Sequence, residues 1–374
     1  MTPRNVRIID PEAIRQNMAA LRAITPASAR MLAVVKADGY GHGAAETARA
    51  ALAGGADMLA VAAVGEGEAL RQASILEPPI LVLGAVTAED VERGVASGLT
   101  QTVCSPAMVR LCEAAAERLG LTARVHLKVD TGMGRIGVRT LEERDAVLQA
   151  LRDCPHVSLT GAFTHFSDAD GDEDGDQYTR EQFQRFLQLT RDLPAGVIRH
   201  CANSAALDKF PEMALDMVRA GISLYGYPPV PSRAELRMCM TWLAKVSHVK
   251  TVEPGACVSY GRTFRADRPM VLATVTCGYA DGYHRAASGQ AQVLIRGRRL
   301  PVVGRICMDQ MVVNATSLPD VRPEEPVVLM GRSGDQVISA EDIARWAGTI
   351  SYEILTSSAS RVERVYTSQE EIQP

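Results

Sequence analysis

Short apolar runs alternate with alanine-rich helical stretches along the chain as far as a proline-rich segment at 225–233. The first of them, residues 33–35, is a short, wholly apolar run bounded by turn residues, which is typical of a parallel strand covered on both faces. Between the runs, the segment 105–120 carries helix signals: a Ser N-cap, a proline at the first helical position and a closing glycine. Strands are predicted at residues 31–36, 58–64, 80–84, 101–104, 124–130, 159–165, 197–203 and 218–226.

This succession of strand–helix units predicts a TIM-like (β/α)8 barrel, an α/β fold that typically needs about 250 residues. A doubly wound sheet is the competing interpretation. However, no G-x-G-x-x-G segment follows a predicted strand together with the acidic partner that a dinucleotide site requires. The α/β barrel is therefore the favoured fold class for the first part of the chain.

The pattern changes after residues 225–233. Beyond this segment, short runs of alternating polarity, broken by glycine and proline, predict a mainly β domain. One short helix is predicted at 339–348, from a Ser N-cap followed by acidic residues to a glycine. We expect two domains, a barrel at 1–232 and a β-rich C-terminal domain at 233–374.

Composition narrows the classes of function. The net charge of -4 gives no positive footprint for nucleic acid or for an anionic membrane surface. No apolar run approaches the roughly 18 to 20 residues of a spanning helix, and the start of the chain is too polar for a signal peptide. The 8 cysteines show no CxxC spacing, which indicates reduced core thiols rather than a disulfide frame or a metal site. We expect a cytoplasmic protein without a metal, nucleic-acid or membrane partner.

The first predicted strand runs into a lysine in the stretch AVVKADGYGHG, residues 33–43. Lys36 has two interpretations. It could snorkel to the rim of the sheet, since lysine is seldom fully buried. Alternatively it could form a Schiff base, for which the amine must lose its proton near neutral pH, so that burial helps.

Polar residues, together with one glycine, lie on the other predicted strands, at the face of a barrel where the chemistry of this fold takes place. They are Lys128, Asp130, His165, Asn203, Ser204, Arg219 and Gly221. Singly, His165 could be a satisfied core histidine and Arg219 a surface ion-pair partner. Ionisable groups gathered at one end of one barrel nevertheless indicate a site.

A bound phosphate is indicated by Ser204 and by residues 220–222. The late strands of such barrels commonly bind phosphate with backbone N–H groups and hydroxyls. A phosphate anchor combined with a lysine at a strand end makes pyridoxal 5'-phosphate the leading cofactor, with Lys36 as the residue that carries it.

Motifs along nearly the whole chain resemble the alanine racemase family. They are AVVKADGYGHG (33–43), LKVDTGMGRIG (127–137), FTHFSDAD (163–170), CANSAA (201–206), VRAGISLYG (218–226), VSYGRTF (258–264), GYADGY (278–283), GRICMDQ (304–310) and ISYEIL (350–355). The resemblance implies a pyridoxal-phosphate barrel followed by a β-domain, and a head-to-tail homodimer. It also implies an isomerase that interconverts L-alanine and D-alanine and supplies D-alanine for peptidoglycan.

The resemblance assigns roles by position. It makes Lys36 and Tyr260 the bases of a two-base mechanism, with Tyr260 acting in the site of the other subunit. It places Arg219 opposite the pyridine nitrogen, with His165 and His200 around it. The residues expected to contact the cofactor are Lys36, Tyr40, His165, Asn203, Ser204, Arg219, Gly221, Ile222 and Tyr352.

By the same resemblance, Arg135 and the backbone of Met308 from the other chain would receive the substrate carboxylate. Tyr279 and Asp309 would support that loop, and Lys128 resembles a lysine that can be carbamylated to orient Arg135. The outer substrate corridor would be formed by Asp170, Arg285, Arg305 and Ile350. The stretch SSASRVERVY near the C-terminus is too generic to add support.

Other proteins stay compatible with the sequence. A barrel-type pyridoxal-phosphate decarboxylase would be expected to offer a carboxylate to the ring nitrogen, where this chain offers Arg219, although Cys307 fits such an enzyme. A non-catalytic pyridoxal-phosphate carrier resembles the barrel alone, so the extra domain with Tyr260 argues against it. A racemase of broader amino-acid specificity is a further alternative.

Overall fold

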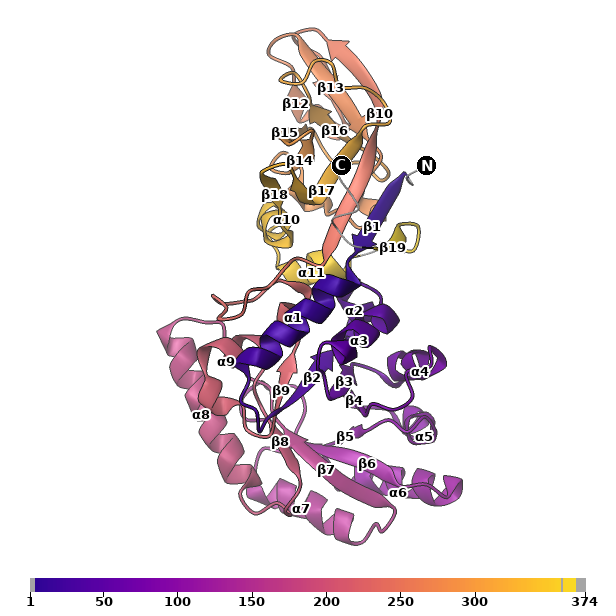
Figure 1. Cartoon of the computed structure of the whole chain (residues 1–374), viewed down its shortest axis with the longest axis vertical. Helices are drawn as coiled ribbons and strands as arrows, with labels where there is room; N and C mark the ends of the chain where they lie inside the picture. The colour runs from indigo at the N-terminus through magenta and orange to yellow at the C-terminus, as the bar shows by residue number, and fades with distance from the viewer. Residues whose placement is uncertain (1–3, 358, 368–374) are drawn as a thin grey trace. The chain divides into compact units, whose positions relative to one another are not determined.

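The computed structural model describes residues 4–357 and 359–367, and the contacts among them divide the chain into two units (Figure 1). One unit consists of residues 14–237, and the other of residues 4–13 together with 238–367. No helix in these described ranges is long and apolar enough to cross a membrane.

The unit of residues 14–237 is built around parallel strands. They are β2 (Arg30–Val34), β3 (Met58–Val61), β4 (Ile80–Val82), β5 (Gln101–Val103), β6 (Ala123–Lys128), β7 (Val157–Phe163), β8 (Ile198–His200) and β9 (Met217–Ala220). They form two sheets, in the orders β4-β3-β2-β9 and β5-β6-β7-β8. Hydrogen bonds from Val82 N to Thr100 O (2.9 Å) and from Arg219 N to Ala202 O (3.0 Å) join the two sheets at both edges. The strands thus close into the predicted (β/α)8 barrel.

Helices connect the barrel strands, and capping residues fix where they begin. They are α1 (Pro11–Ile24), α2 (Lys36–Tyr40), α3 (Ala44–Ala53), α4 (Val64–Gln72), α5 (Ala88–Ala96), α6 (Pro106–Leu119), α7 (Leu141–Arg152), α8 (Glu173–Thr190) and α9 (Ser204–Lys209), with the 3-10 helices η1 (Pro211–Met213) and η2 (Ile222–Tyr225). The predicted helix at 105–120 is confirmed as α6. The Ser105 hydroxyl accepts the N–H of Met108 at 3.3 Å, and Gly120 closes the helix with a φ of 64°.

The other unit is mainly β, in agreement with the sequence pattern. Its strands are β1 (Asn5–Ile9), β10 (Met240–Val252), β11 (Cys257–Val258), β12 (Phe264–Arg265), β13 (Met270–Val275), β14 (Gln292–Ile295), β15 (Arg298–Val303), β16 (Met311–Asn314), β17 (Pro326–Ser333), β18 (Gln336–Ile338) and β19 (Glu363–Tyr366). Its helices are η3 (Tyr260–Arg262), η4 (Tyr279–Asp281), η5 (Arg285–Ala287), α10 (Ala340–Ala347) and α11 (Ser351–Thr356). The predicted helix at 339–348 is confirmed as α10, because Ser339 caps it and Gly348 ends it with a φ of 69°.

The first strand of the chain belongs to this β unit and not to the barrel. Strand β1 pairs antiparallel with β10, from Asn5 opposite Ala244 to Ile9 opposite Met240, and parallel with β19 (Figure 1). The expected division at 1–232 and 233–374 assigns this strand to the barrel, which the contacts contradict. All five residues of β1 are buried. This burial depends on β10 and β19, which lie on either side of β1 and far from it in the sequence.

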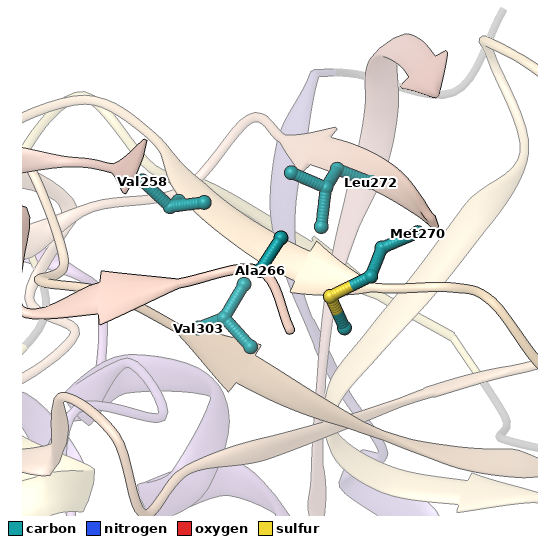
Figure 2. Packing of buried hydrophobic residues seen from close by; sticks show 5 residues of the cluster. All are labelled: Val258, Ala266, Met270, Leu272 and Val303. Atoms are coloured by element: carbon teal, nitrogen blue, oxygen red, sulfur yellow. The ribbon is translucent and has the colours of Figure 1, made fainter. Parts of the chain in front are cut away.

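A small apolar cluster lies beneath the hairpin of β11 and β12. Its members are Val258, Ala266, Met270, Leu272 and Val303, which Figure 2 shows side by side. Burying a side chain such as valine, leucine or methionine stabilises the fold by about 1.5–3 kcal/mol. The cluster therefore anchors both ends of the segment that carries Tyr260, which lies between β11 and β12.

Candidate active site

Lys36 follows β2 in a turn of left-handed backbone. The sequence predicts Lys36 as the last residue of its strand, but the strand ends at Val34 and Lys36 begins α2. Left-handed φ angles occur at Ala37 (52°), Asp38 (53°), Gly39 (61°) and Tyr40 (50°). Such a conformation costs about 1–2 kcal/mol for a residue other than glycine, so neighbouring groups must hold the turn.

Glu66 of α4 is one of these groups. One of its carboxylate oxygens accepts the N–H of Ala37 at 2.7 Å, and the other accepts the N–H of Ala62 at 2.6 Å. Glycine is required at position 39, because a Cβ there would lie 2.8 Å from Thr47 Oγ1. These contacts fix the point from which the Lys36 side chain extends.

Burial lowers the pKa of the Lys36 ammonium below its ordinary value, and the positive charge of Arg135 lowers it further. The Glu66 carboxylate opposes this effect, while Arg219 adds a smaller contribution to it. A lowered pKa increases the neutral fraction of the amine near pH 7, which Schiff-base formation and proton removal both require. This environment suits a reactive lysine.

Arg219, in β9, is buried and donates hydrogen bonds from both terminal nitrogens. Its Nη1 donates to Nδ1 and to the backbone oxygen of His200, at 3.2 and 3.1 Å. Its Nη2 donates to the carbonyl oxygens of Thr164 and Cys201, both at 2.9 Å, and to Nδ1 of His165 at 3.2 Å. Burial lowers the pKa of Arg219 to about 10, so it stays protonated at neutral pH. Its Nε–H has no partner among the described residues and remains available to a ligand.

A chain of neutral histidines supports this guanidinium. Arginine can only donate, so Nδ1 of His200 accepts from it and Nε2 of His200 carries the proton. That Nε2 lies 3.1 Å from Nδ1 of His126 and donates to it. Burial lowers the pKa of His126 to about 3 and that of His200 well below its ordinary value, so both rings stay uncharged beside Arg219.

The hydroxyls of Tyr40 and Ser204 converge on the backbone of Gly221. Ser204 Oγ accepts the N–H groups of Gly221 at 3.0 Å and of Ser223 at 3.4 Å. A Cβ added to Gly221 would lie 3.3 Å from Tyr40 Oη and 3.6 Å from Ser204 Oγ. Glycine thus leaves open a cradle bounded by two hydroxyls and backbone N–H groups, which is the chemistry of a phosphate site.

Asn203 has a structural part in this cradle. Its side-chain oxygen accepts the N–H of Ala206 at 3.0 Å and so caps α9, the helix that begins with Ser204. Ile222, also expected to contact the cofactor, is buried as the first residue of η2. The cap holds Ser204 where its hydroxyl meets Gly221.

Lys128 and Arg135 lie on either side of a glycine-rich loop after β6. The Lys128 ammonium donates to the carbonyl oxygen of Val129 at 2.7 Å, and burial together with the charge of Arg219 lowers its pKa to about 8. The Asp130 carboxylate accepts the N–H groups of Gly132 and Gly134 and thereby shapes the loop. Arg135 is exposed, yet its charge lowers the pKa of Lys36, Lys128 and His165.

Asp170, expected in the substrate corridor, is exposed in the barrel unit. The other remaining site residues belong to the β unit, and several are exposed. The exposed fraction is 68% for Tyr260, 52% for Met308 and 61% for Ile350, unusually high values for large apolar or aromatic side chains. Tyr260 begins η3, and a Cβ at the next residue, Gly261, would lie 3.1 Å from Nη1 of Arg305. Arg305 thus packs against the turn that presents Tyr260.

Three residues that the sequence pattern did not single out take part in the barrel site. Glu66 holds the turn after Lys36, His126 extends the histidine chain, and the Thr164 carbonyl binds Arg219. His126 lies two residues before Lys128 in a strand whose alternate side chains share a face, a signal that could have found it. Glu66 lies in a different strand–helix unit from Lys36, and sequence spacing gives no comparable signal.

Both units match known families, and the matches agree with this division. Family models described as "Alanine racemase, N-terminal domain" and "Alanine racemase, C-terminal domain" match residues 9–229 and 239–366. A relative named alanine racemase from Desulfosudis oleivorans is 44% identical over 374 residues, which cover 96% of this chain and 95% of that one.

Two solved structures have a similar architecture. The alanine racemase of Bacillus anthracis with bound L-Ala-P has a TM-score of 0.90 and 34% identity, covering 98% of this chain and 96% of that one. The histidine racemase of Leuconostoc mesenteroides has a TM-score of 0.89 and 29% identity, covering 98% of each chain. Similarity of this extent leaves the decarboxylase and carrier interpretations without support.

Proposed function

The chain belongs to the alanine racemase family, and from this premise we propose how its own residues carry out the reaction. It is a pyridoxal-phosphate-dependent isomerase that racemises alanine, and its D-alanine supplies peptidoglycan. Lys36 carries the cofactor and serves as one base, and Tyr260 of the partner subunit serves as the other.

The barrel residues fit this cofactor. The Lys36 amine, with its lowered pKa, suits the aldehyde. The cradle of Tyr40, Ser204 and Gly221 suits the phosphate, since a Cβ at Gly221 would fill it. The unengaged Nε–H of Arg219 suits the ring nitrogen.

The hydrogen bonding of Arg219 is the single observation that carries the proposal. Its terminal nitrogens contact three carbonyl oxygens and two imidazoles, and none of these partners is a carboxylate. Because arginine only donates, Arg219 would keep the ring nitrogen of pyridoxal phosphate unprotonated, and the ring would then withdraw electrons less strongly. A weaker electron sink disfavours transamination, a side reaction that a racemase must avoid. A barrel decarboxylase would be expected to place a carboxylate here.

Two bases are needed because racemisation removes the α-proton on one face of the substrate and returns a proton on the other. Bound to the substrate amine, pyridoxal phosphate withdraws electrons from the α-carbon and makes its proton acidic. Lys36 takes or returns the proton on one face, and Tyr260 of the partner subunit does so on the opposite face. Arg135 and the backbone N–H of Met308 from the other chain hold the substrate carboxylate.

The exposure of Tyr260, Met308 and Ile350 supports a homodimer. A head-to-tail pair with two-fold symmetry covers the same surface on both copies, and each copy gives its partner what it receives. In this arrangement Tyr352 completes the phosphate site, Tyr279 and Asp309 support the Met308 loop, and Asp170, Arg285, Arg305 and Ile350 line the substrate corridor. We also place the protein in the cytoplasm, in keeping with its scattered thiols.

Alanine is the preferred substrate in this proposal. Because the chain is also similar to a histidine racemase, the test includes a second amino acid. The test has two parts. Incubation with L-alanine should give loss of optical rotation without carbon dioxide, and L-histidine should be racemised far more slowly. Borohydride reduction of the purified protein followed by peptide mapping should place the cofactor on the peptide with Lys36. A label on Lys128, or on no lysine, would contradict the central assignment.

A further inference from the structure

A second arginine, Arg361, lies in SSASRVERVY, a stretch near the C-terminus whose sequence is too generic to indicate a role. It belongs to the β unit and joins the two carboxylates of Asp281 and Asp309. Its Nε donates to Asp281 Oδ1 and its Nη1 to Asp309 Oδ1, both at 2.7 Å. Its Nη2 donates to the carbonyl oxygen of Met308 at 3.4 Å. Arg361 therefore contacts the loop to which the substrate carboxylate is assigned.

The same loop is fixed from the other side by η4. The N–H of Tyr279 donates to the carbonyl oxygen of Cys307 at 3.0 Å, and the N–H of Ala280 donates to that of Met308 at 2.9 Å. The approach is so close that a Cβ on Gly278 would lie 2.4 Å from both carbonyl oxygens. Only glycine permits this contact.

Asp281 connects η4 with Arg361. It is 2% exposed, its Oδ2 accepts the N–H of Gly278 at 2.8 Å, and its Oδ1 accepts from Arg361. The buried carboxylate of Asp281 thus holds both the first turn of η4 and the guanidinium of Arg361. Loss of Arg361 would leave Asp281 with a buried oxygen that lacks its charged donor, and would free Asp309.

The geometry of the peptide between Cys307 and Met308 determines where the N–H of Met308 points. A trans peptide is planar, so its C=O and N–H point in opposite directions. With the Cys307 carbonyl held by Tyr279, the N–H of Met308 must point away from η4. It donates to no group among the described residues, and Met308 is exposed, so this N–H is presented to a ligand.

We propose that Arg361 is a positioning residue that, through Asp281 and Asp309, holds the Met308 N–H in the direction required by the substrate carboxylate. This inference rests on the proposed function, because that function assigns the carboxylate to Met308. Arg361 touches neither substrate nor cofactor in this assignment. It acts on substrate binding in the site of the partner subunit.

The test replaces Arg361 with glutamine in the holoenzyme. Arg296→Gln is the matched control, since Arg296 also joins two carboxylates of the same unit, Asp320 and Glu325, but contacts no residue of the Met308 loop. For Arg361→Gln we expect the KM for alanine to rise about tenfold while kcat stays within about twofold, because charge-assisted hydrogen bonds are lost from a binding group. Arg296→Gln should change neither constant by more than about twofold.

Two small probes separate positioning from general damage. Propionate has the carboxylate of the substrate but no amine, and ethylamine has the amine but no carboxylate. Calorimetry should show propionate binding weakened by the same factor as the KM, with ethylamine binding unchanged. Unchanged propionate binding, or an equal loss for both probes, would overturn the inference.

Arg361→Lys keeps a positive charge but cannot bridge both carboxylates, so an effect of about threefold is expected. If Arg361→Gln does not fold, this variant decides the question by the same two probes. Failure of the proposed function looks different, since the unmodified protein would then not racemise alanine at all. An effect of Arg361→Gln no larger than that of Arg296→Gln, in a protein that does racemise alanine, contradicts only the inference about Arg361.

Discussion

The site residues of the barrel unit and those of the β unit are held by different means. In the barrel, Arg219, His200 and Lys128 are buried, and side-chain hydrogen bonds join the arginine and histidines. In the β unit, Tyr260 and Met308 are exposed, and backbone hydrogen bonds hold the loop of Met308. The barrel side is a largely buried, charged environment held by side chains, whereas the side in the β unit is an exposed surface held by its backbone. The comparison shows that site residues can be held in a fixed position without being buried.

The largest expected effect tests whether the two sets of residues must come from different chains. Lys36→Ala and Tyr260→Phe homodimers should each lose activity by a factor on the order of 10³ or more, since each lacks a general base. In verified heterodimers of the two variants, one site lacks both bases and the other is intact. Activity should return to about half of that of the parent dimer.

A matched pair of barrel variants provides the control for this mixing experiment. Heterodimers of Lys36→Ala with Arg219→Glu carry one damaged barrel at each site, so no recovery is expected. Recovery in this pair would mean that Lys36 and Arg219 of one site come from different chains. No recovery in the pair of Lys36→Ala with Tyr260→Phe would place both bases within one chain.

A smaller effect on activity is expected when Arg219 of the barrel is replaced, because this residue controls the protonation of the cofactor's ring nitrogen in the proposed site. Arg219→Glu removes the donor from three carbonyls and two imidazoles and lets the ring nitrogen keep a proton. Racemisation should fall roughly 10²-fold, and pyruvate from transamination should become measurable.

Arg144→Gln controls for the loss of a buried arginine in the same unit, because Arg144 donates to the Leu189 carbonyl outside the site. This control should leave the ratio of pyruvate to D-alanine unchanged. Parental racemisation without pyruvate in Arg219→Glu would show that the argument about the ring nitrogen is wrong.

The smallest effect is on stability and follows from the burial of Lys128. The pKa of Lys128 is about 8 in the folded protein, against an ordinary value of 10.5. Between these values the unfolded chain binds more protons than the folded one, so the free energy of unfolding should rise with pH. The contribution of one such lysine is at most about 1.4 kcal/mol per pH unit.

Urea titrations from pH 7 to pH 10 measure this dependence. Lys128→Met should remove this part of the slope, whereas Val125→Ala in the same strand should lower stability equally at every pH, because it removes no titrating group. An unchanged slope in Lys128→Met would mean that burial does not depress the pKa of this lysine.

Barrel strands such as β3 and β4 could be predicted because they are buried throughout and so appear as continuous apolar runs. The exact position of Lys36 relative to the strand could not, since nothing in Ala37, Asp38 or Tyr40 indicates left-handed backbone. Glu66, which lies in another segment, accepts the N–H of Ala37 and helps to hold that conformation. The local pattern of apolar residues predicts an element whose structure depends on burial. It does not predict a conformation that depends on a contact with a distant segment.

Long-range pairing explains the other differences from the sequence-based expectations. Strand β1 joins the β unit because β10 and β19 flank it, and those partners lie more than two hundred residues away. Arg361 gains its significance only when Asp281 and Asp309 are found beside it. Its surrounding sequence gives no indication of either contact. The family resemblance supplied the residues expected to touch the ligand, but not those that hold them.

The left-handed turn after Lys36 has a consequence for the order in which the molecule forms. Three of its residues other than glycine each disfavour this conformation by about 1 kcal/mol or more, so a free chain would adopt it in roughly one molecule in a hundred or fewer. The turn can become stable only after Glu66 has reached the N–H of Ala37, that is, after β3 and α4 have assembled beside β2. A nascent chain therefore exposes Lys36 as an ordinary, protonated lysine. The reactive amine thus requires β3 and α4 to lie beside β2, and the isolated segment does not supply it.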